Sequence, residues 1–355
     1  MAKVVSSFWK GKKVLVTGHT GFKGSWMSLW LQQMGAEVCG YALKPPTEPA
    51  LYDMAQVGNG MKSVIADIAD YDKVLQTVKD FKPEIVFHMA AQPLVRYSYE
   101  APVETYRTNV MGTVNILDAC LKVEGIKAVI NVTTDKCYEN YEWIWGYKET
   151  DRLGGSDPYS NSKGCSEMVT QSYRKSFYEK KKIPIASARA GNVIGGGDWA
   201  RDRLLPDLMM SIISKKKLVI RNPKSTRPWQ HVLEPLSGYL VLAQKMYETQ
   251  SLELDSFNFG PHDDEAQNVE YIVKQLLSKW DDNAGYEVIP SDIIEATYLK
   301  LDCSKAKSVL NWKSKLTINQ CLDMIIDWNK KAQANPASVR EVTISQIQAY
   351  TQLMN

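Results

Sequence analysis

The feature that most restricts the fold of this chain is a strand, a glycine turn and a helix near its start. Lys13-Val-Leu-Val-Thr17 is a short apolar strand, and the helical apolar periodicity of Ser25–Met34 follows it closely. The glycines between them let the backbone approach a pyrophosphate at the helix N-terminus. The unit predicts a dinucleotide site formed by Gly18, His19, Thr20, Gly21, Phe22, Lys23 and Gly24. Lys23 either pairs with a phosphate or lies on the solvated surface.

The rest of the chain alternates strand and helix patterns. Further strands are expected at 37–43, 63–68, 84–91, 128–132, 183–189 and 254–259, and helices at 70–81, 103–123, from Pro158, 268–280, 304–310, 317–332 and, as a peripheral helix, 339–353. This alternation predicts an α/β fold with a doubly wound parallel sheet, or Rossmann fold. We expect residues 1–190 to form this domain and to take back about 232–260. Residues 191–355 would mainly form a smaller C-terminal α/β substrate-binding domain.

The ends of the predicted strands suggest further cofactor contacts. Asp67, next to Ile68, could reach an adenine, and the small residues Ala90 and Ala91 would let the backbone lie against a cofactor. No acidic residue follows the second strand, where a ribose-binding acid is expected. Lys44 could instead face a 2′-phosphate, so these residues alone leave NAD and NADP open.

Composition excludes several classes of function. A net charge of +3 is small for 355 residues and does not suggest a nucleic-acid partner. No apolar run approaches the roughly 20 residues of a membrane span, and the N-terminus lacks the apolar segment of a secretory signal. The six cysteines are scattered and the four histidines show no metal-ligand spacing. We therefore expect a cytoplasmic protein with reduced thiols, no membrane partner and no metal.

The stretch Ala128–Tyr138 concentrates reactive side chains. Its apolar first half indicates a buried strand, which ends on Thr134, Asp135 and Lys136. In open α/β sheets the ligand crevice lies at such carboxyl ends. Downstream, Tyr159 and Lys163 are four residues apart on one helix face. A polar loop and a surface Tyr–Lys pair are the simpler explanations, but the glycine turn upstream favours a catalytic site.

With these residues in place, the chain resembles the extended short-chain dehydrogenase/reductase family over nearly its whole length. The matching motifs are Asp67-Ile68, Ala90-Ala91, Asn109-x-x-Gly112-Thr113, Asp157-Pro158-Tyr159 and Arg189-x-x-Asn192-Val193. Within that family, Thr134-Asp135-Lys136 resembles the nucleotide-sugar 4,6-dehydratases, which carry Thr-Asp-Glu.

The resemblance implies an NAD cofactor and a nucleotide-sugar substrate. It adds Gln92, Asn109, Thr133, Tyr159, Lys163 and Arg189 to the cofactor contacts, and it assigns Arg96, Asn192, Arg203, Leu204, Arg227 and His231 to the substrate. The family also pairs two helices across a two-fold axis, which implies a homodimer or homotetramer. Ile116, Val169 and Tyr173 are the expected interface positions.

The implied chemistry can be assigned to side chains. Tyr159 would deprotonate the sugar C4 hydroxyl, with Lys163 and the nicotinamide charge favouring its phenolate, while Thr134 hydrogen-bonds the C4 oxygen. Asp135 would protonate the departing C6 oxygen, which requires a pKa well above its usual value of about 3.9. Lys136 replaces the family's glutamate base. It acts either as the C5 base, against a reference pKa of about 10.4, or as an electrostatic stabiliser of the enolate.

Three alternatives stay open at this point. Asp135 and Lys136 could form a surface ion pair that has no part in catalysis. The chain could be a nucleotide-sugar epimerase, which would retain the C6 hydroxyl. It could also be a non-catalytic dinucleotide sensor, because fold alone does not determine function.

Overall fold

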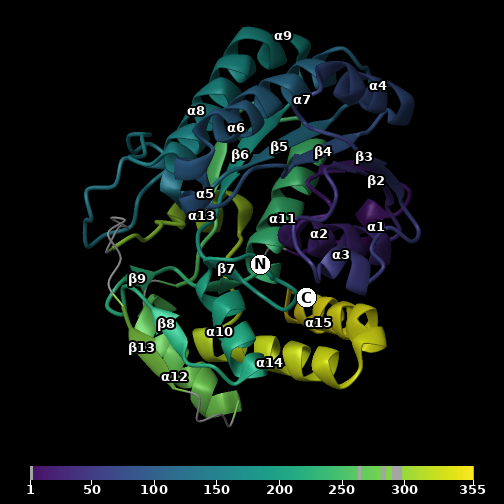
Figure 1. The fold of residues 1–355 in the computed structure, drawn as a ribbon. Helices are drawn as coiled ribbons and strands as arrows, with labels where there is room; N and C mark the ends of the chain where they lie inside the picture. The colour runs from purple at the N-terminus through teal and green to yellow at the C-terminus, as the bar shows by residue number, and fades with distance from the viewer. Residues whose placement is uncertain (1–2, 263–264, 281–284, 290–297, 355) are drawn as a thin grey trace.

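A parallel β-sheet forms the centre of the molecule (Figure 1). The computed structural model describes residues 3–262, 265–280, 285–289 and 298–354. The seven-stranded sheet has the order β11-β6-β5-β4-β1-β2-β3, and every neighbouring pair is parallel. Its strands are β1 (Lys13–Thr17), β2 (Glu37–Ala42), β3 (Lys62–Ile65), β4 (Ile85–His88), β5 (Ala128–Val132), β6 (Ile185–Arg189) and β11 (Ser256–Asn258). This arrangement confirms the prediction of a doubly wound sheet.

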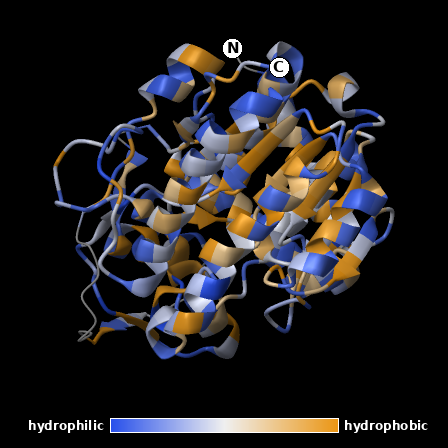
Figure 2. Ribbon diagram, turned by 90° about the horizontal axis from the view of Figure 1, so that it is seen from above, coloured by the Kyte–Doolittle hydropathy of each residue, from blue (hydrophilic) through white to orange (hydrophobic). Residues whose placement is uncertain are grey.

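Helices cover both faces of the sheet. The larger core lies against α2 (Phe22–Gln33) and α11 (Leu233–Thr249), and the second core lies against α4 (Tyr71–Phe81), α7 (Gly112–Leu121) and α8 (Pro158–Tyr173). Alternation along β1 serves both cores, because Val14 and Val16 join the first and Leu15 joins the second. Figure 2 shows the strands as the most hydrophobic elements between mixed helices. Within the described residues, no helix has the length and apolar character needed to cross a bilayer.

The helix expected at 103–123 is in fact interrupted. It consists of α6 (Pro102–Tyr106), the π-helix η1 (Arg107–Met111) and α7. The π-turn carries Asn109, whose side chain donates to Ser162 Oγ of α8 at 2.8 Å. Apolar periodicity does not reveal one wider turn, so the prediction of a continuous helix was wrong here. The preceding α5 (Val95–Glu100) was not predicted.

A second lobe lies beyond the carboxyl ends of the strands, at the lower left in Figure 1. It contains α10 (Leu204–Ser214), α12 (Val269–Trp280), α14 (Ile318–Ala334) and three small strand pairs: β7 (Val193–Ile194) with β10 (Gln230–His231), β8 (Leu218–Ile220) with β13 (Tyr286–Val288), and β9 (Thr226–Arg227) with β12 (Gln267–Asn268). Between these segments the chain returns to the sheet through α11 and β11. The shorter elements are α1 (Ser6–Trp9), α3 (Leu51–Met54), η2 (Asp135–Cys137), η3 (Arg174–Tyr178), α9 (Glu179–Lys181), α13 (Ser304–Leu310) and η5 (Pro336–Ser338).

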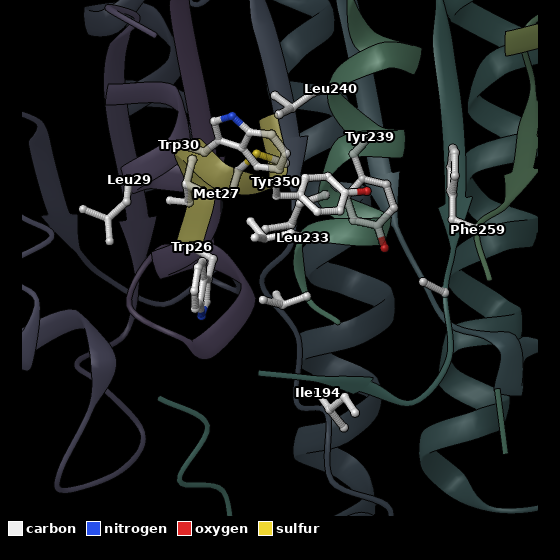
Figure 3. Close-up of a cluster of buried hydrophobic side chains, with 14 of the residues drawn as sticks. Trp26, Met27, Leu29, Trp30, Ile194, Leu233, Tyr239, Leu240, Phe259 and Tyr350 are labelled. Atoms are coloured by element: carbon white, nitrogen blue, oxygen red, sulfur yellow. The ribbon is translucent and has the colours of Figure 1, made fainter. Parts of the chain in front are cut away.

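The C-terminal helix α15 (Val339–Met354) is part of the core, so its prediction as a peripheral helix was wrong. The Tyr350 ring meets Trp30 of α2 edge-on, with 5.8 Å between the ring centroids (Figure 3). Its hydroxyl donates to Oε2 of the buried Glu234 at 2.7 Å. Trp26 and Trp30 themselves are buried, as the helical periodicity predicted.

A buried ion pair connects α8 to the sheet. The Glu167 carboxylate lies 2.8 Å from Nη2 of Arg189, and it also accepts hydrogen bonds from Ser187 Oγ at 2.6 Å and from Thr133 Oγ1. Burial alone would raise the pKa of the Glu167 carboxyl, but Arg189 and the hydroxyl donors outweigh it and lower that pKa. The second guanidinium nitrogen, Nη1, donates to Tyr138 Oη at 2.7 Å.

Removing the charge of Glu167 should therefore destabilise the fold. Glu167→Gln leaves the Arg189 guanidinium buried without its counter-ion, and we expect a loss of roughly 3–5 kcal/mol in urea unfolding at neutral pH. Because the folded-state pKa is depressed, the difference should shrink as the pH falls below about 4.3. Asp327→Asn, which breaks an exposed pair with Lys331, is the control and should cost less than about 1 kcal/mol. Equal effects of both variants would contradict this role.

Candidate active site

The glycine turn forms a cradle at the N-terminus of α2. Gly18 has a φ of +76°, and a Cβ there would lie 2.8 Å from the backbone nitrogen of Ala90. A Cβ at Gly24 would lie 2.1 Å from Gly18 O. Gly21 is the N-cap of α2, and among the described residues no side chain caps the helix. The first-turn amides are thus available to an anion at the positive end of the helix dipole.

Side chains of the turn have different surroundings. His19 is buried against Gly40, its Nε2 lies 2.7 Å from Ser63 Oγ, and burial lowers its pKa to about 4. Thr20 donates to the Leu43 carbonyl at 2.8 Å. Lys23 does not lie on the outer surface, because it lines the same cavity as Asp135 and Tyr159. Burial, together with the nearby cations Arg203 and Lys163, lowers the pKa of Lys23 to about 8.

The ends of the next strands carry other residues of the predicted dinucleotide site. Ala42 ends β2 and the exposed Leu43 and Lys44 follow it. Asp67 lies beyond the end of β3, where its carboxylate accepts from the Ala69 amide and lies 3.7 Å from Arg107 Nη2. The neighbouring Ile68 is buried and fills the space beside the glycine of α7.

The loop after β4 is fixed by hydrogen bonds. Thr17 Oγ1 accepts from the amides of Met89 and Ala90 at 3.0 Å. Asn109 brackets Gln92, since it accepts from the Gln92 amide at 2.8 Å and donates to the Gln92 carbonyl at 3.0 Å. His88 is buried beside Thr17 and Thr113, as expected for a core histidine. These hydrogen bonds hold the segment from Ala90 to Gln92, whose first residue lies against Gly18 of the glycine turn.

Tyr159 and Lys163 lie on the inner face of α8, which begins with Asp157 as its N-cap. Lys163 Nζ donates to the Val132 carbonyl at 3.1 Å, and burial lowers the pKa of Lys163 to about 8. Burial raises the pKa of Tyr159 to about 12, although Thr134 and Arg203 act in the opposite direction. The residues alone therefore hold Tyr159 protonated. The combined effect of Lys163 and the nicotinamide charge on this phenol stays a prediction.

Thr134, Asp135 and Lys136 follow β5 and meet α8 in the cavity. The Asp135 side chain is only 1% exposed, whereas Lys136 is half-buried. Thr134 Oγ1 donates to Asp135 Oδ1 at 3.0 Å, and the other carboxyl oxygen has no hydrogen-bond partner in the described part of the chain. Burial raises the pKa of Asp135, against the effects of Lys136, Thr134, Arg227 and Lys23. A surface ion pair is therefore excluded as the explanation of this sequence.

One cavity joins these groups to the second lobe. It is lined by Lys23, Thr134, Asp135, Lys136 and Tyr159 and by the predicted substrate residues Arg96, Asn192, Arg203, Leu204 and Arg227. Residues 200–230 are rich in lysine and arginine, and these side chains lie in two different places. Lysines 215–217 are exposed, while Arg203 and Arg227 face the cavity. A second cavity, between Glu139 and Ser160, shares Asp135, Lys136 and Arg227 with the first.

Two predicted site residues point elsewhere. His231 is buried edge-on to Trp26 and accepts from the Leu233 amide, and it lines neither cavity. Arg189 uses its guanidinium on Glu167, on Tyr138 and on the Glu149 carbonyl. Both positions favour a structural role over contact with a ligand.

The geometry also reveals residues that the sequence did not suggest. Asp198 accepts from Arg203 Nη1 at 3.0 Å inside the cavity, and no motif spacing announces this pair. Asp207 lines the same cavity, where burial and the neighbouring Asp202 raise its pKa to about 6. The position of Gly191 against Asp135 is likewise visible only in three dimensions.

Comparison with known proteins shows the family of the chain. The family described as GDP-mannose 4,6 dehydratase matches residues 15–325. The chain belongs to this dehydratase family. It is 54% identical over 333 residues to the CDP-glucose 4,6-dehydratase of Salmonella typhimurium, covering 91% of this chain and 92% of that one. It is 24% identical to the dTDP-glucose 4,6-dehydratase of Haemophilus influenzae, covering 89% of this chain and 97% of that one.

Solved structures support the dehydratase fold. The dTDP-glucose 4,6-dehydratase of Bacillus anthracis in complex with NAD has a TM-score of 0.77 at 21% identity and covers 92% of this chain and 98% of that chain. The UDP-glucose 4-epimerase of Thermotoga maritima has a TM-score of 0.78 at 21% identity and covers 90% and 99%. Dehydratases and epimerases share this architecture, so the fold alone does not separate the two reactions.

Proposed function

We propose that this protein is an NAD-dependent CDP-glucose 4,6-dehydratase, a hydro-lyase that converts the nucleotide sugar to its 4-keto-6-deoxy form and water. The observation that carries the proposal is the meeting of Thr134, Asp135, Lys136 and Tyr159 in one cavity. Tyr159 and Thr134 are the protein groups proposed for oxidation at C4, for which NAD would be the hydride acceptor. Asp135 and Lys136 add the acid and base that an elimination needs and that a simple oxidation does not.

The choice of cytidine as the base of the substrate rests on sequence similarity and not on identified contacts to the base. The stretches Thr17–Ser25, Thr134–Tyr138 and Arg227–Val232 resemble CDP-glucose 4,6-dehydratase, and the relative at 54% identity bears that name. With this substrate, the proposed role is in cytoplasmic deoxysugar biosynthesis, of the kind that supplies O-antigen and other lipopolysaccharide sugars.

The glycine cradle fits NAD. The uncapped N-terminus of α2 and the space that Gly18 and Gly24 leave open suit a pyrophosphate, and Ala90 and Ala91 leave room beside it. Held in this cradle, NAD would supply the acceptor for the hydride from C4 of the sugar and the donor of the hydride to C6. Lys23 in the first turn of α2 has its charge at the unfavourable end of the helix dipole, which an arriving phosphate group would compensate.

The cations of the cavity suit the diphosphate of the substrate. Arg227 lies on β9 and Arg203 immediately precedes α10, so the two reach the cavity from different elements of the second lobe. Guanidinium groups bind phosphate oxygens through directed, charge-assisted hydrogen bonds. Asp198 holds the Arg203 side chain and thereby sets its orientation.

Tyr159 is the proposed base toward the C4 hydroxyl, and Thr134 holds the reacting oxygen. For this role the pKa of Tyr159 must fall from about 12, and a positive charge brought close to the phenol would lower it. Lys163 lies on the same helix face and is buried with Tyr159, so it can contribute such a charge.

Asp135 and Lys136 are the proposed elimination pair. Once C4 is a ketone, the C5 hydrogen becomes acidic because the carbanion is an enolate. Lys136 removes this proton as a neutral amine, and Asp135 protonates the departing C6 hydroxyl. The buried position of Asp135 suits an acid, because burial favours its neutral form.

A homo-oligomer is the proposed assembly. The prediction that Ile116 lies in the interface was wrong, because this residue is only 1% exposed and packs in the chain's own core. The other two predicted interface residues, Val169 and Tyr173, are partly buried against the same core. The same helices nevertheless leave large apolar side chains in solvent: Val103 is 79% exposed, Met111 50%, Met168 52% and Phe177 49%. A second copy of the chain, paired through α6, η1, α8 and η3, would cover them.

The complete reaction can be tested with two labels. Substrate deuterated at C4 should give product that carries the deuterium in the C6 methyl group, and reaction in heavy water should place solvent deuterium at C5, as read by NMR and mass spectrometry. An epimerase would leave the C6 hydroxyl in place, and a sensor would give no turnover. Loss of the C4 label to solvent or free cofactor would contradict the dehydratase assignment.

Lys136 variants should separate its two possible roles. Lys136→Ala should allow oxidation at C4 but lower product formation by about 10²–10⁴-fold, so that reduced-nicotinamide absorbance persists on the enzyme. If Lys136 is the base, Lys136→Glu should be more active than Lys136→Ala, because it supplies the family's carboxylate. If Lys136 only stabilises the enolate, the negative charge should make Lys136→Glu less active. Lys224→Ala, an exposed lysine, is the control.

The interface can be tested by placing a charge in it. Met168→Asp should convert the oligomer to a monomer in sedimentation experiments, because the new carboxylate would be buried against apolar side chains. Met210→Asp on α10, where the methionine is 50% exposed, is a matched control that should leave the assembly unchanged. A monomeric wild type at micromolar concentration would contradict the proposed assembly.

A further inference from the structure

The proposed acid Asp135 fits into a recess formed by a residue with no side chain. Asp135 follows β5 and Gly191 follows the neighbouring β6, so the two residues come from adjacent strand ends. A Cβ on Gly191 would lie 1.7 Å from Asp135 Oδ2, 2.3 Å from its Cγ and 2.8 Å from Oδ1. No side chain larger than hydrogen at position 191 is compatible with this placement of the carboxyl group.

The glycine is not required by its own backbone. Its φ lies outside the left-handed region, so an alanine could adopt the same conformation. Nor does another part of the core block a Cβ there more closely, because the three nearest atoms all belong to the Asp135 carboxyl group. A side chain at position 191 would therefore mainly displace the Asp135 carboxyl group.

The Gly191 side of the recess is held in place by Gln230. This buried residue of β10 donates from Nε2 to the Gly191 carbonyl at 3.2 Å and to the Phe259 carbonyl at 2.8 Å. It thus ties the loop after β6 to the segment after β11. Thr134 holds the other carboxyl oxygen from the β5 side, so the Asp135 group is held between two fixed strand ends.

Building on the proposed dehydratase function, we propose that Gly191 is a positioning residue for the catalytic acid. Its missing side chain creates the buried recess that fixes the Asp135 carboxyl and favours its protonated form, which can donate to the departing C6 hydroxyl. In this recess Oδ2 is buried without a hydrogen-bond partner among the described residues. A neutral carboxyl tolerates such a place much better than a carboxylate does.

Charged and titratable groups reach Asp135 from several elements. They are Lys23 of α2, Lys136 and Cys137 of its own loop, Tyr159 of α8, Arg227 of β9 and Tyr239 of α11. Burial raises the pKa of Asp135, and the cations among these groups oppose that rise. If the carboxyl moves out of the recess toward the cavity, burial raises its pKa less and the cations lower its pKa more. Its pKa then falls.

Gly191→Ala should therefore impair the acid while leaving oxidation at C4 possible. A displacement on the order of 1 Å typically costs about 10²-fold in rate, so we expect kcat to fall by that factor with KM nearly unchanged. Reduced-nicotinamide absorbance should accumulate during turnover. The alkaline limb of the kcat–pH profile should move to lower pH, because a more solvated Asp135 loses its proton earlier. Wild-type kcat and pH profile in Gly191→Ala would overturn the proposal.

A stability cycle tests the recess independently of the reaction. Gly191→Ala should lower the melting temperature, and Asp135→Ala in the same chain should restore it, because the double variant removes the atoms that the new Cβ meets. Additive destabilisation would show that Gly191 acts elsewhere and would overturn the proposal. Gly260→Ala, whose Cβ would have Cys303 Sγ as its nearest neighbour at 3.3 Å, is the control and should keep wild-type kinetics. If the wild-type enzyme releases no 4-keto-6-deoxy product, the proposed function fails, and the stability cycle still decides whether the recess exists.

Discussion

The arrangement of the active site depends on the buried contact between Glu167 and Arg189. Glu167 belongs to α8, the helix that carries Tyr159 and Lys163, and its partners come from the ends of β5 and β6. Arg189 extends the connection to Tyr138, just beyond the catalytic loop, and Tyr138 in turn donates to Asn258 Oδ1 of β11 at 2.7 Å. A buried ion pair contributes little net stability compared with a well-packed apolar pair, but it tolerates only a narrow geometry. It therefore fixes the helix with the tyrosine against the strand with the threonine and the acid.

Much of the framework could be predicted because local signals and the final fold agree. β1 and the glycine turn lie where the apolar strand pattern and the glycines predict them. α8 begins at the predicted Pro158, and α13 has the predicted range 304–310. Their determinants are close in sequence, so a single chain suffices to find them. The placement of Thr134 and Asp135 at the ligand crevice followed from one rule, that the carboxyl ends of parallel strands share one edge of the sheet. Tyr159 was added from its spacing to Lys163 and from the family resemblance.

The remainder depends on contacts between distant segments, which a linear pattern does not encode. The π-turn at Asn109 is stabilised by partners on the loop after β4 and on α8. α15 is buried because Tyr350 finds Glu234 and Trp30, more than a hundred residues away in the chain. Arg189 lies within a family motif, yet a motif does not say whether a guanidinium faces a ligand or a buried carboxylate. The protonation states of Tyr159 and Asp135 depend on burial, which only the assembled site provides.

The burial of Asp135 bears on the replacement of a glutamate by Lys136. An adjacent acid and amine can exist as an ion pair or as two neutral groups, and only the neutral forms can donate and accept the protons of an elimination. In water the ion pair is favoured, but burying two charges costs several kcal/mol unless their geometry and hydrogen bonds are excellent. Here Oδ2 of Asp135 has no donor among the described residues, and no ion pair of 4 Å or less joins it to Lys136. A bound sugar that displaces the remaining water would raise the cost of separated charge further. The recess that favours the neutral form of Asp135 also lessens the negative charge next to the Lys136 side chain, so one geometric feature bears on both members of the pair.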